Sequence, residues 1–170
     1  MIIRPAMPSE VGPLAALARA TYTDAFDHSF SASDLAAHLE TRLSDAYFRA
    51  IAEDVFLFAE DEGRLIGFIQ FGDAGSMNRG DQEIRRLYVL SAFQNRRAGT
   101  KLTIEALAHP RLRDAQNVWL DVWERNDGAR RLYERFGFSI AGSKPLTLAS
   151  GVAADRDLIM VRRAPARGGR

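Results

Sequence analysis

A short polar segment near the middle of the chain, residues 94–100, combines residue types that bind phosphate. Its sequence is Gln-Asn-Arg-Arg-Ala-Gly-Thr, and it lies between a strand-like run at 82–90 and the start of a helix-like stretch. The first backbone N–H groups of a helix have no partner within the helix, and the helix dipole adds partial positive charge, so a pyrophosphate can bind there. Arg96 and Arg97 add full charges, and Gly99 allows a ligand to approach the backbone closely. The segment therefore predicts a phosphate-binding loop.

Two other interpretations of this segment stay open on the sequence alone. The pattern is also typical of a polar strand-to-helix loop whose arginines face water, because single short motifs often match by chance. Nucleic-acid binding is the second, since six arginines surround Tyr88 and Phe93: Arg85, Arg86, Arg96, Arg97, Arg111 and Arg113. The formal net charge of only +1, without a helix-turn-helix, zinc or RNA-binding signature, argues against it, so we expect no nucleic-acid partner.

A second pattern lies between residues 126 and 138. Asn126 stands at a predicted helix start, and the apolar residues that follow form one helical stripe: Ala129, Leu132, Tyr133 and Phe136. Gly137 can end this helix in a left-handed conformation. By periodicity alone Tyr133 is a core residue, so a chemical role for its hydroxyl needs independent support.

The composition excludes several classes of protein. The chain has 170 residues, 46% hydrophobic and 26% charged, which is typical of a globular domain. It has no cysteine, which removes disulfides, thiolate metal sites and a cysteine nucleophile, and its three histidines are too scattered to indicate a metal site. The longest apolar runs fall far short of the roughly 20 residues that span a bilayer, and the N-terminus lacks a signal-peptide pattern. We expect a cytoplasmic protein with neither a metal nor a membrane partner.

Apolar periodicity predicts one α/β domain over residues 1–163. Strands are expected at 1–6, 55–60, 65–71, 82–90, 117–122, 138–142 and 157–162, with a hairpin link at 61–63. Helices are expected at 9–26, from Ser33 or Asp34 through Phe48, at 101–109 with Pro110 at its end, and at 126–136. Residues 164–170 are predicted to be a disordered tail.

Taken together, these patterns resemble the GNAT N-acetyltransferase superfamily over residues 1–163. Residues 94–99 resemble its acyl-CoA pyrophosphate loop, Q/R-x-x-G-x-G/A, with Arg97 where the family has its first glycine, and 83–89 resembles the central strand before the loop. The second signature is matched by Asn126, Ala129, Leu132, Tyr133, Glu134, Gly137 and Phe138. The resemblance implies an α/β (α+β) fold with a mixed, mostly antiparallel central sheet flanked by helices, and acyl-CoA bound where the central strands splay.

The resemblance also implies a reaction and the residues that perform it. An amine attacks the acetyl thioester directly in a ternary complex, with Glu83 as the candidate base and Tyr133 as the candidate acid for the departing thiolate. Glu83 is otherwise an exposed strand residue, or one that only attracts a cation while a water chain removes the proton. Asn126 would contact the pantetheine arm or hold the nearby loop. Acetyl-CoA is expected to bind mainly through backbone groups at 87–89 and the amides of 96–100. The full set of expected acetyl-CoA-binding residues is Leu87, Tyr88, Val89, Gln94, Arg96, Arg97, Ala98, Gly99, Thr100, Asn126 and Tyr133.

A narrower resemblance concerns the acceptor. Residues 118–126 and 157–160 are similar to the bacterial spermidine/spermine N-acetyltransferase branch, whereas 143–155 diverges. The implied partners are acetyl-CoA and a small primary amine, with a polyamine as the finer expectation and a homodimer as one option for assembly. A polycation favours an acidic mouth, for which the candidates are Asp24, Asp27, Glu83, Asp121 and Asp155. The sequence does not show whether these carboxylates converge.

Two alternative functions remain open at this stage. The acceptor can instead be a peptide or protein N-terminus or another amine. The chain can also be a sensor module that binds acyl-CoA without catalysis. Arg97 in place of a glycine favours the sensor, whereas Glu83 and Tyr133 favour retained catalysis.

Overall fold

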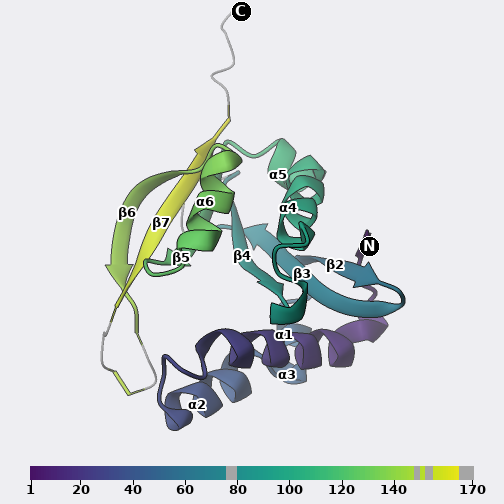
Figure 1. Cartoon of the computed structure of the whole chain (residues 1–170). Helices are drawn as coiled ribbons and strands as arrows, with labels where there is room; N and C mark the ends of the chain where they lie inside the picture. Colours follow the sequence, from purple (N-terminus) through teal and green to yellow (C-terminus); the bar gives the residue numbers. More distant parts are fainter. Residues whose placement is uncertain (76–79, 148–149, 152–154, 165–170) are drawn as a thin grey trace, which may run out of the picture.

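The computed structural model describes residues 1–75, 80–147, 150–151 and 155–164, which form a seven-stranded sheet with helices on both faces (Figure 1). The predicted tail lies, apart from Ala164, outside the described residues. The strands are β1 (Ile2–Pro5), β2 (Val55–Asp61), β3 (Arg64–Asp73), β4 (Gln82–Val89), β5 (Asn117–Trp123), β6 (Ser139–Pro145) and β7 (Arg156–Arg163). Their order is β1-β2-β3-β4-β5-β7-β6, and only the β4–β5 pair is parallel. The mixed, mostly antiparallel sheet is thus confirmed.

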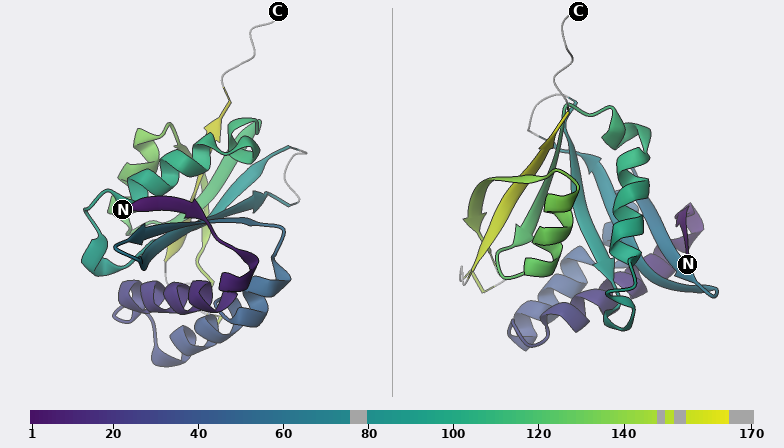
Figure 2. Two further views of the ribbon diagram at one scale, coloured as in Figure 1. Left: turned by 90° about the vertical axis from the view of Figure 1, so that its right-hand side faces the viewer. Right: turned by 45° about the horizontal axis from the view of Figure 1, so that its top comes forward.

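The helices form two groups, one on each face of the sheet (Figure 2). One group contains a 3-10 turn (Pro8–Glu10), α1 (Val11–Phe26), α2 (Ala32–Arg42) and α3 (Asp45–Ala50). The other contains α4 (Ala98–Ala108), α5 (Pro110–Arg113) and α6 (Asp127–Arg135), with a 3-10 turn (Ser91–Phe93) leading into α4. Each face has its own apolar cluster, centred on Phe58 and Phe68 under α1–α3 and on Leu102 and Leu120 under α4–α6. No helix in the described part of the chain is long and apolar enough to cross a membrane.

The hairpin expected between β2 and β3 is present. Asp61 pairs with Arg64, so the link consists of two residues, Glu62 and Gly63. Both have positive φ, 50° and 77°, as a tight turn that matches the twist of its strands requires.

The predicted single helix ending near Phe48 is wrong, because two helices occupy this region. Leu43 has an extended φ of −133° between α2 and α3, which interrupts the helical hydrogen bonding. Ser44 then caps α3, its side chain accepting a hydrogen bond from the Tyr47 amide at 3.2 Å. The break allows Leu43 and Phe48 to be buried together under α1, which a continuous helix of this pattern would not achieve.

The start of α2 also differs from expectation, and one short helix was not expected. Ser31, rather than Ser33 or Asp34, caps α2, and its hydroxyl accepts a hydrogen bond from the Asp34 amide at 3.1 Å. Pro110 follows the end of α4 as predicted, but it also begins α5, where proline's missing N–H costs nothing.

The sheet feature that positions the site is the early separation of β4 from β5. The two strands pair only between residues 82–84 and 118–120. Directly after this short ladder, Arg85 forms a bulge relative to β3, which bends β4 locally. β4 then continues to Val89 and β5 to Trp123, and no described strand pairs with their facing edges. Backbone N–H and C=O groups on these edges are therefore available to a ligand.

Candidate active site

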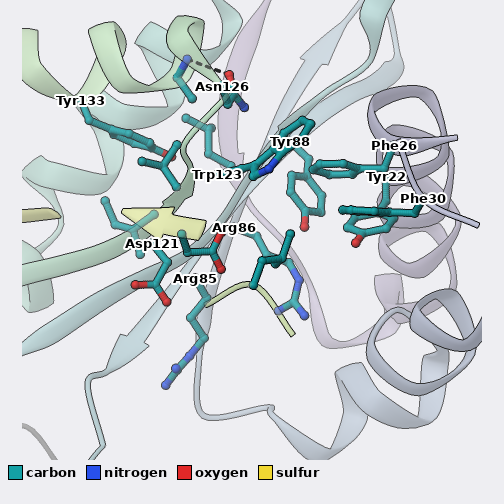
Figure 3. A pocket seen from close by; sticks show the side chains of 16 residues that line it. Tyr22, Phe26, Phe30, Arg85, Arg86, Tyr88, Asp121, Trp123, Asn126 and Tyr133 are labelled. Atoms are coloured by element: carbon teal, nitrogen blue, oxygen red, sulfur yellow. Dashed lines mark hydrogen bonds between the residues drawn. The ribbon is translucent and has the colours of Figure 1, made fainter. Parts of the chain in front are cut away.

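Two cavities adjoin where β4 and β5 separate. The first, called here the α4 cavity, has a volume of about 420 Å³ and is lined, among others, by Gln94, Asn95, Arg97, Ala98, Gly99, Thr100, Leu132 and Arg135. The second, called the aromatic cavity, has a volume of about 240 Å³ and takes its name from the rings of Tyr22, Phe26, Phe30, Tyr88 and Trp123 (Figure 3). Leu87, Asn126 and Ala129 line both cavities. One site thus extends from the start of α4 across β4 to α1.

The loop before α4 has the geometry of an anion cradle. Asn95 and Arg97 both adopt the left-handed conformation, with φ of 62° and 63°. Left-handed residues within such a turn direct neighbouring backbone N–H groups toward one side, where an anion can bind. The first hydrogen bond within α4 runs from the Lys101 amide to the Arg97 carbonyl at 2.9 Å, which leaves the amides of 98–100 at the helix start. These groups fit a pyrophosphate.

The two arginines of this loop diverge. The Arg97 side chain lines the α4 cavity, whereas the Arg96 guanidinium stacks over the Phe93 ring at 5.2 Å and is not among the lining groups. Arg135 of α6 also lines the cavity and was missed, because no local pattern distinguishes it from other exposed helical arginines. Positive charge at this cavity therefore comes from Arg97 and Arg135.

The free stretch of β4 separates the two cavities. Leu87 and Val89 line the α4 cavity and Tyr88 lines the aromatic cavity, as the alternation of side chains along a strand requires. Gln94 holds the end of this stretch, since its Nε2 donates to the Val89 carbonyl at 3.3 Å. The structure thus brings together the predicted residues of the strand and the loop.

Helix α6 and its cap place Asn126 where the two cavities meet and Tyr133 in the wall of the aromatic cavity. Asn126 caps the helix, its Oδ1 accepting a hydrogen bond from the Ala129 amide at 3.0 Å. The buried Tyr133 ring packs edge-on against Phe138 at 5.7 Å, so it is a core residue, yet it also lines the aromatic cavity. Its hydroxyl makes no hydrogen bond to any described residue, and burial raises the pKa of this phenol. Tyr133 therefore keeps its proton at neutral pH and can offer it to a ligand.

The aromatic wall was not predicted. The rings of Tyr22 and Phe26 of α1 lie 4.5 Å apart at a tilt, Phe30 stacks on Phe26 at 5.2 Å, and Trp123 of β5 lies 5.7 Å from Phe26. The spacing of four residues between the first three rings was the available signal. Trp123 is distant in sequence, and only the fold brings it to them.

Glu83, the candidate base, lies beside the aromatic cavity rather than among its lining residues. Its carboxylate forms an ion pair with Arg85, which does line the cavity. Burial is the main cause that raises the pKa of Glu83, and nearby Asp121 adds to the effect. Its carboxyl therefore binds a proton more readily than an ordinary glutamate.

The acidic side chains proposed to form a mouth converge only in part. Asp121 lies near Glu83 and is paired with Lys144. The other three candidates have partners of their own: Asp24 accepts from Ser91, Asp27 contacts His28, and Asp155 holds Arg125 and the Trp123 indole. Asp157, which was not proposed, lines the aromatic cavity with Asp121. In the described ranges, no group of three or more His, Cys, Asp or Glu residues is arranged to hold a metal ion.

Comparison with known proteins identifies the class of protein. The sequence model of the Acetyltransferase (GNAT) family matches residues 18–138, which include the cradle, the free stretch of β4 and Tyr133. The chain belongs to this family, and it is accordingly an acyltransferase that uses acetyl-CoA as its acyl donor. The superfamily resemblance inferred from the sequence is confirmed.

Individual relatives leave the acceptor open. The "uncharacterized N-acetyltransferase Rv2669" of Mycobacterium tuberculosis is 29% identical over 160 residues, 91% of this chain and 97% of the relative. The "spermine/spermidine N(1)-acetyltransferase" of Bacillus subtilis is 31% identical over 87 residues, only 48% of this chain and 57% of the relative.

Solved structures agree on the fold. A PaiA N-acetyltransferase from Thermoplasma acidophilum, in complex with coenzyme A, has a TM-score of 0.73 at 19% identity and covers 96% of this chain and 98% of its own. A putative acetyltransferase, YncA from Salmonella typhimurium with its cofactor acetyl-CoA, has a TM-score of 0.70 at 20% identity, with 100% and 97% covered.

The cradle predicts that Gly99→Asp weakens acetyl-CoA binding. A Cβ at Gly99 would lie 3.5 Å from Leu132 Cδ2 and 3.9 Å from Leu87 Cδ2, so a side chain fits there and enters the α4 cavity. A carboxylate beside phosphate should raise the Kd about tenfold or more, whereas the neutral, isosteric Gly99→Asn should raise it less. Calorimetry on folded protein measures both, and equal affinities of Gly99→Asp and the parent would contradict the cradle.

The left-handed Arg97 predicts that Arg97→Gly stabilises the protein. A side chain in this conformation costs about 1 kcal/mol, which glycine avoids. We expect the free energy of unfolding in urea to rise by about that amount while acetyl-CoA binding is retained, because the amides stay in place. Arg97→Ala removes the same charge but keeps Cβ, and equal stability of the two variants would refute the explanation.

Proposed function

We propose that the protein transfers the acetyl group of acetyl-CoA to a primary amine of a small molecule, by direct attack in a ternary complex. The observation that carries the proposal is the pair of adjoining cavities at the β4–β5 separation, with Tyr133 in the wall of the aromatic cavity. The larger cavity has the cradle for a charged donor, and the smaller one has room for a compact acceptor.

The proposed donor site follows from the groups left without partners. The amides of 96–100, with Arg97 and Arg135, hold the pyrophosphate. Backbone groups at 87–89 pair with the pantetheine amides, as an added strand would, because β5 does not reach them. Bound acetyl-CoA supplies an electrophilic thioester carbonyl and a thiolate leaving group. Asn126, which lines both cavities, borders the pantetheine arm and holds the start of α6.

The proposed reaction balances through two proton transfers. The acceptor ammonium gives one proton to a base, the free amine forms the new C–N bond, and the C–S bond breaks. Tyr133 donates its proton to the departing thiolate and recovers one from solvent. The raised pKa of Tyr133 keeps the phenol protonated until that moment. The absence of cysteine is consistent with transfer that does not pass through an acetyl-cysteine.

Tyr133→Phe tests this function most simply. The variant keeps the ring and its packing against Phe138 but removes the hydroxyl. We expect turnover, followed as thiol release with a panel of amines, to fall roughly 10²–10⁴-fold, while acetyl-CoA affinity and melting temperature change little. A rate within about threefold of the parent would withdraw the acid role, since that is under 1 kcal/mol of transition-state stabilisation. A parent protein that binds acetyl-CoA but releases no thiol with any amine would favour the sensor function instead.

Glu83 is the proposed base, acting through water because it does not line the cavity. Its carboxyl must be ionised to accept a proton, so kcat/KM should fall as pH drops through its raised pKa. Glu83→Gln should lower turnover by about 100-fold and remove this acidic limb. The matched control is Glu62→Gln in the exposed β2–β3 turn, which removes the same charge at a residue that lines neither cavity. An unchanged acidic limb in Glu83→Gln would assign the base elsewhere.

The predictions on the acceptor amine, the cellular location, the assembly and the domain boundary stay predictions. A polyamine acceptor is supported by the partial match to the Bacillus subtilis enzyme and by two carboxylates, Asp121 and Asp157, at the aromatic cavity. The cytoplasmic location, the homodimer and the domain boundary at residue 163 are proposals on the same footing.

A further inference from the structure

Four charged side chains among the described residues line the aromatic cavity, and two of them are neutralised by neighbours. Arg85 is paired with Asp54, at 2.9 Å, and with Glu83. Asp121 is paired with Lys144. The remaining two are Arg86 of β4 and Asp157 of β7. Neither of these two has a described side chain of opposite charge paired with it, and this indicates the charges that a ligand would carry.

Arg86 is held by neutral groups only. Its guanidinium donates to Gln70 Oε1 at 2.5 Å, to the Arg42 carbonyl at 3.3 Å and to the Tyr47 hydroxyl at 3.4 Å, and it lies 5.1 Å above the Tyr47 ring. The fully buried Gln70 is itself fixed, since its Nε2 donates to Asp54 at 2.6 Å. Within the described ranges, no carboxylate pairs with Arg86. These neutral partners satisfy the N–H groups of Arg86 but leave its charge without a counter-charge, so an anion that binds beside it gains a charge-assisted hydrogen bond.

Asp157 is the complementary case. The carboxylate of this half-buried residue, at the start of β7, forms no hydrogen bond or ion pair with any residue in the described part of the chain. Lys144 lies opposite in the β6–β7 register, but its ammonium donates to Asp121 instead. Burial, reinforced by Asp121 and only partly offset by the charge of Lys144, raises the pKa of the Asp157 carboxyl, so a further cation beside it would be favourable.

Arg86 and Asp157 line the same cavity and influence the same two tyrosines. Both lie within electrostatic reach of the Tyr22 and Tyr88 phenols, whose pKa values Asp157 raises and Arg86 lowers, while burial is the main cause of the upward shift. Figure 3 shows the Arg86 guanidinium near these two hydroxyls, with Phe26, Phe30 and Trp123 beside them. The cavity therefore combines one unpaired cation, one unpaired anion and an aromatic wall.

We propose that the acceptor is a small zwitterion, an amino acid with a free carboxylate and an aromatic or large apolar side chain. The carboxylate binds Arg86, the ammonium group approaches Asp157, and the side chain packs on the aromatic rings. This inference rests on the proposed N-acetyltransferase function and specifies its substrate class. A polyamine would bring a second ammonium to Arg86, and a long peptide would bring a neutral amide there.

Matched acceptors test the proposal on the unmodified protein. Thiol release from acetyl-CoA is followed with L-phenylalanine, L-phenylalaninamide, phenethylamine and spermidine. The amide keeps the shape of phenylalanine without its charge, and phenethylamine lacks the group altogether. We expect kcat/KM for phenylalanine to exceed the other three by about 10- to 100-fold, the range for a hydrogen bond to a charged group.

Variants locate the preference. Arg86→Gln should abolish the advantage of phenylalanine over phenylalaninamide, and Arg86→Lys should restore part of it. Arg49→Gln, on the exposed surface of α3, removes the same charge outside the cavity and should leave the advantage unchanged. Asp157→Asn should raise KM for all the amines without changing the carboxylate preference. Melting temperatures show that each variant is folded.

The outcomes distinguish failure of the zwitterionic acceptor from failure of the acetyltransferase function. If spermidine or phenethylamine reacts as well as phenylalanine, the zwitterion is overturned while the acetyltransferase function stands. If no amine releases thiol, the proposed function fails for this panel. Calorimetry then tests the substrate class separately, by comparing the binding of N-acetyl-L-phenylalanine and of N-acetylphenethylamine to the protein with CoA present. Tighter binding of the carboxylate compound, lost in Arg86→Gln, supports it, and equal binding overturns it.

Discussion

The site depends on a parallel strand pair that stops after three residues. Hydrogen bonding between β4 and β5 ends at Ile84 and Leu120, and the bulge at Arg85, relative to β3, follows directly after this ladder. Each backbone group left unpaired in a buried place costs about 1–3 kcal/mol, so a ligand that pairs with them gains binding energy that no side chain needs to supply. The same separation opens one cavity toward α4 and another toward α1, and α6 lines both, with Ala129 in each and Tyr133 in the aromatic cavity.

Around this opening, charged side chains are held in place by contacts between residues that are distant in sequence. Gly72 of β3 leaves room for the Asp54 carboxylate, which a Cβ at that position would strike. Asp54 in turn holds Arg85 and Gln70, and Gln70 orients Arg86 toward the aromatic cavity. Arg85 and Arg86, adjacent in the chain, thus lie in different surroundings: Arg85 in an ion-pair network and Arg86 among neutral groups.

Local sequence patterns were sufficient to predict the parts of the site in which the functional residues and the signals that shape the backbone lie in one short segment. The loop at 94–100 and the helix from Asn126 could be predicted because capping, dipole and apolar stripe all act within a few residues. The break at Leu43 could not, since tertiary burial of Phe48 overrides the helical period there. Nor could the pairing of Asp121 with Lys144, or the lack of a partner for the Asp157 carboxylate among the described residues, because both depend on how β5, β6 and β7 meet in space.

The most direct test of the central claim is amide hydrogen exchange with and without acetyl-CoA, read out along the chain. The account predicts slower exchange on binding at residues 85–90 and 96–100, where β4 and the start of α4 offer free N–H groups, with little change in β1 or β6 at the sheet's two edges. Saturating acetyl-CoA that leaves both segments unprotected, or that protects other parts of the sheet instead, would contradict the claim that the separation of β4 and β5 forms the donor site.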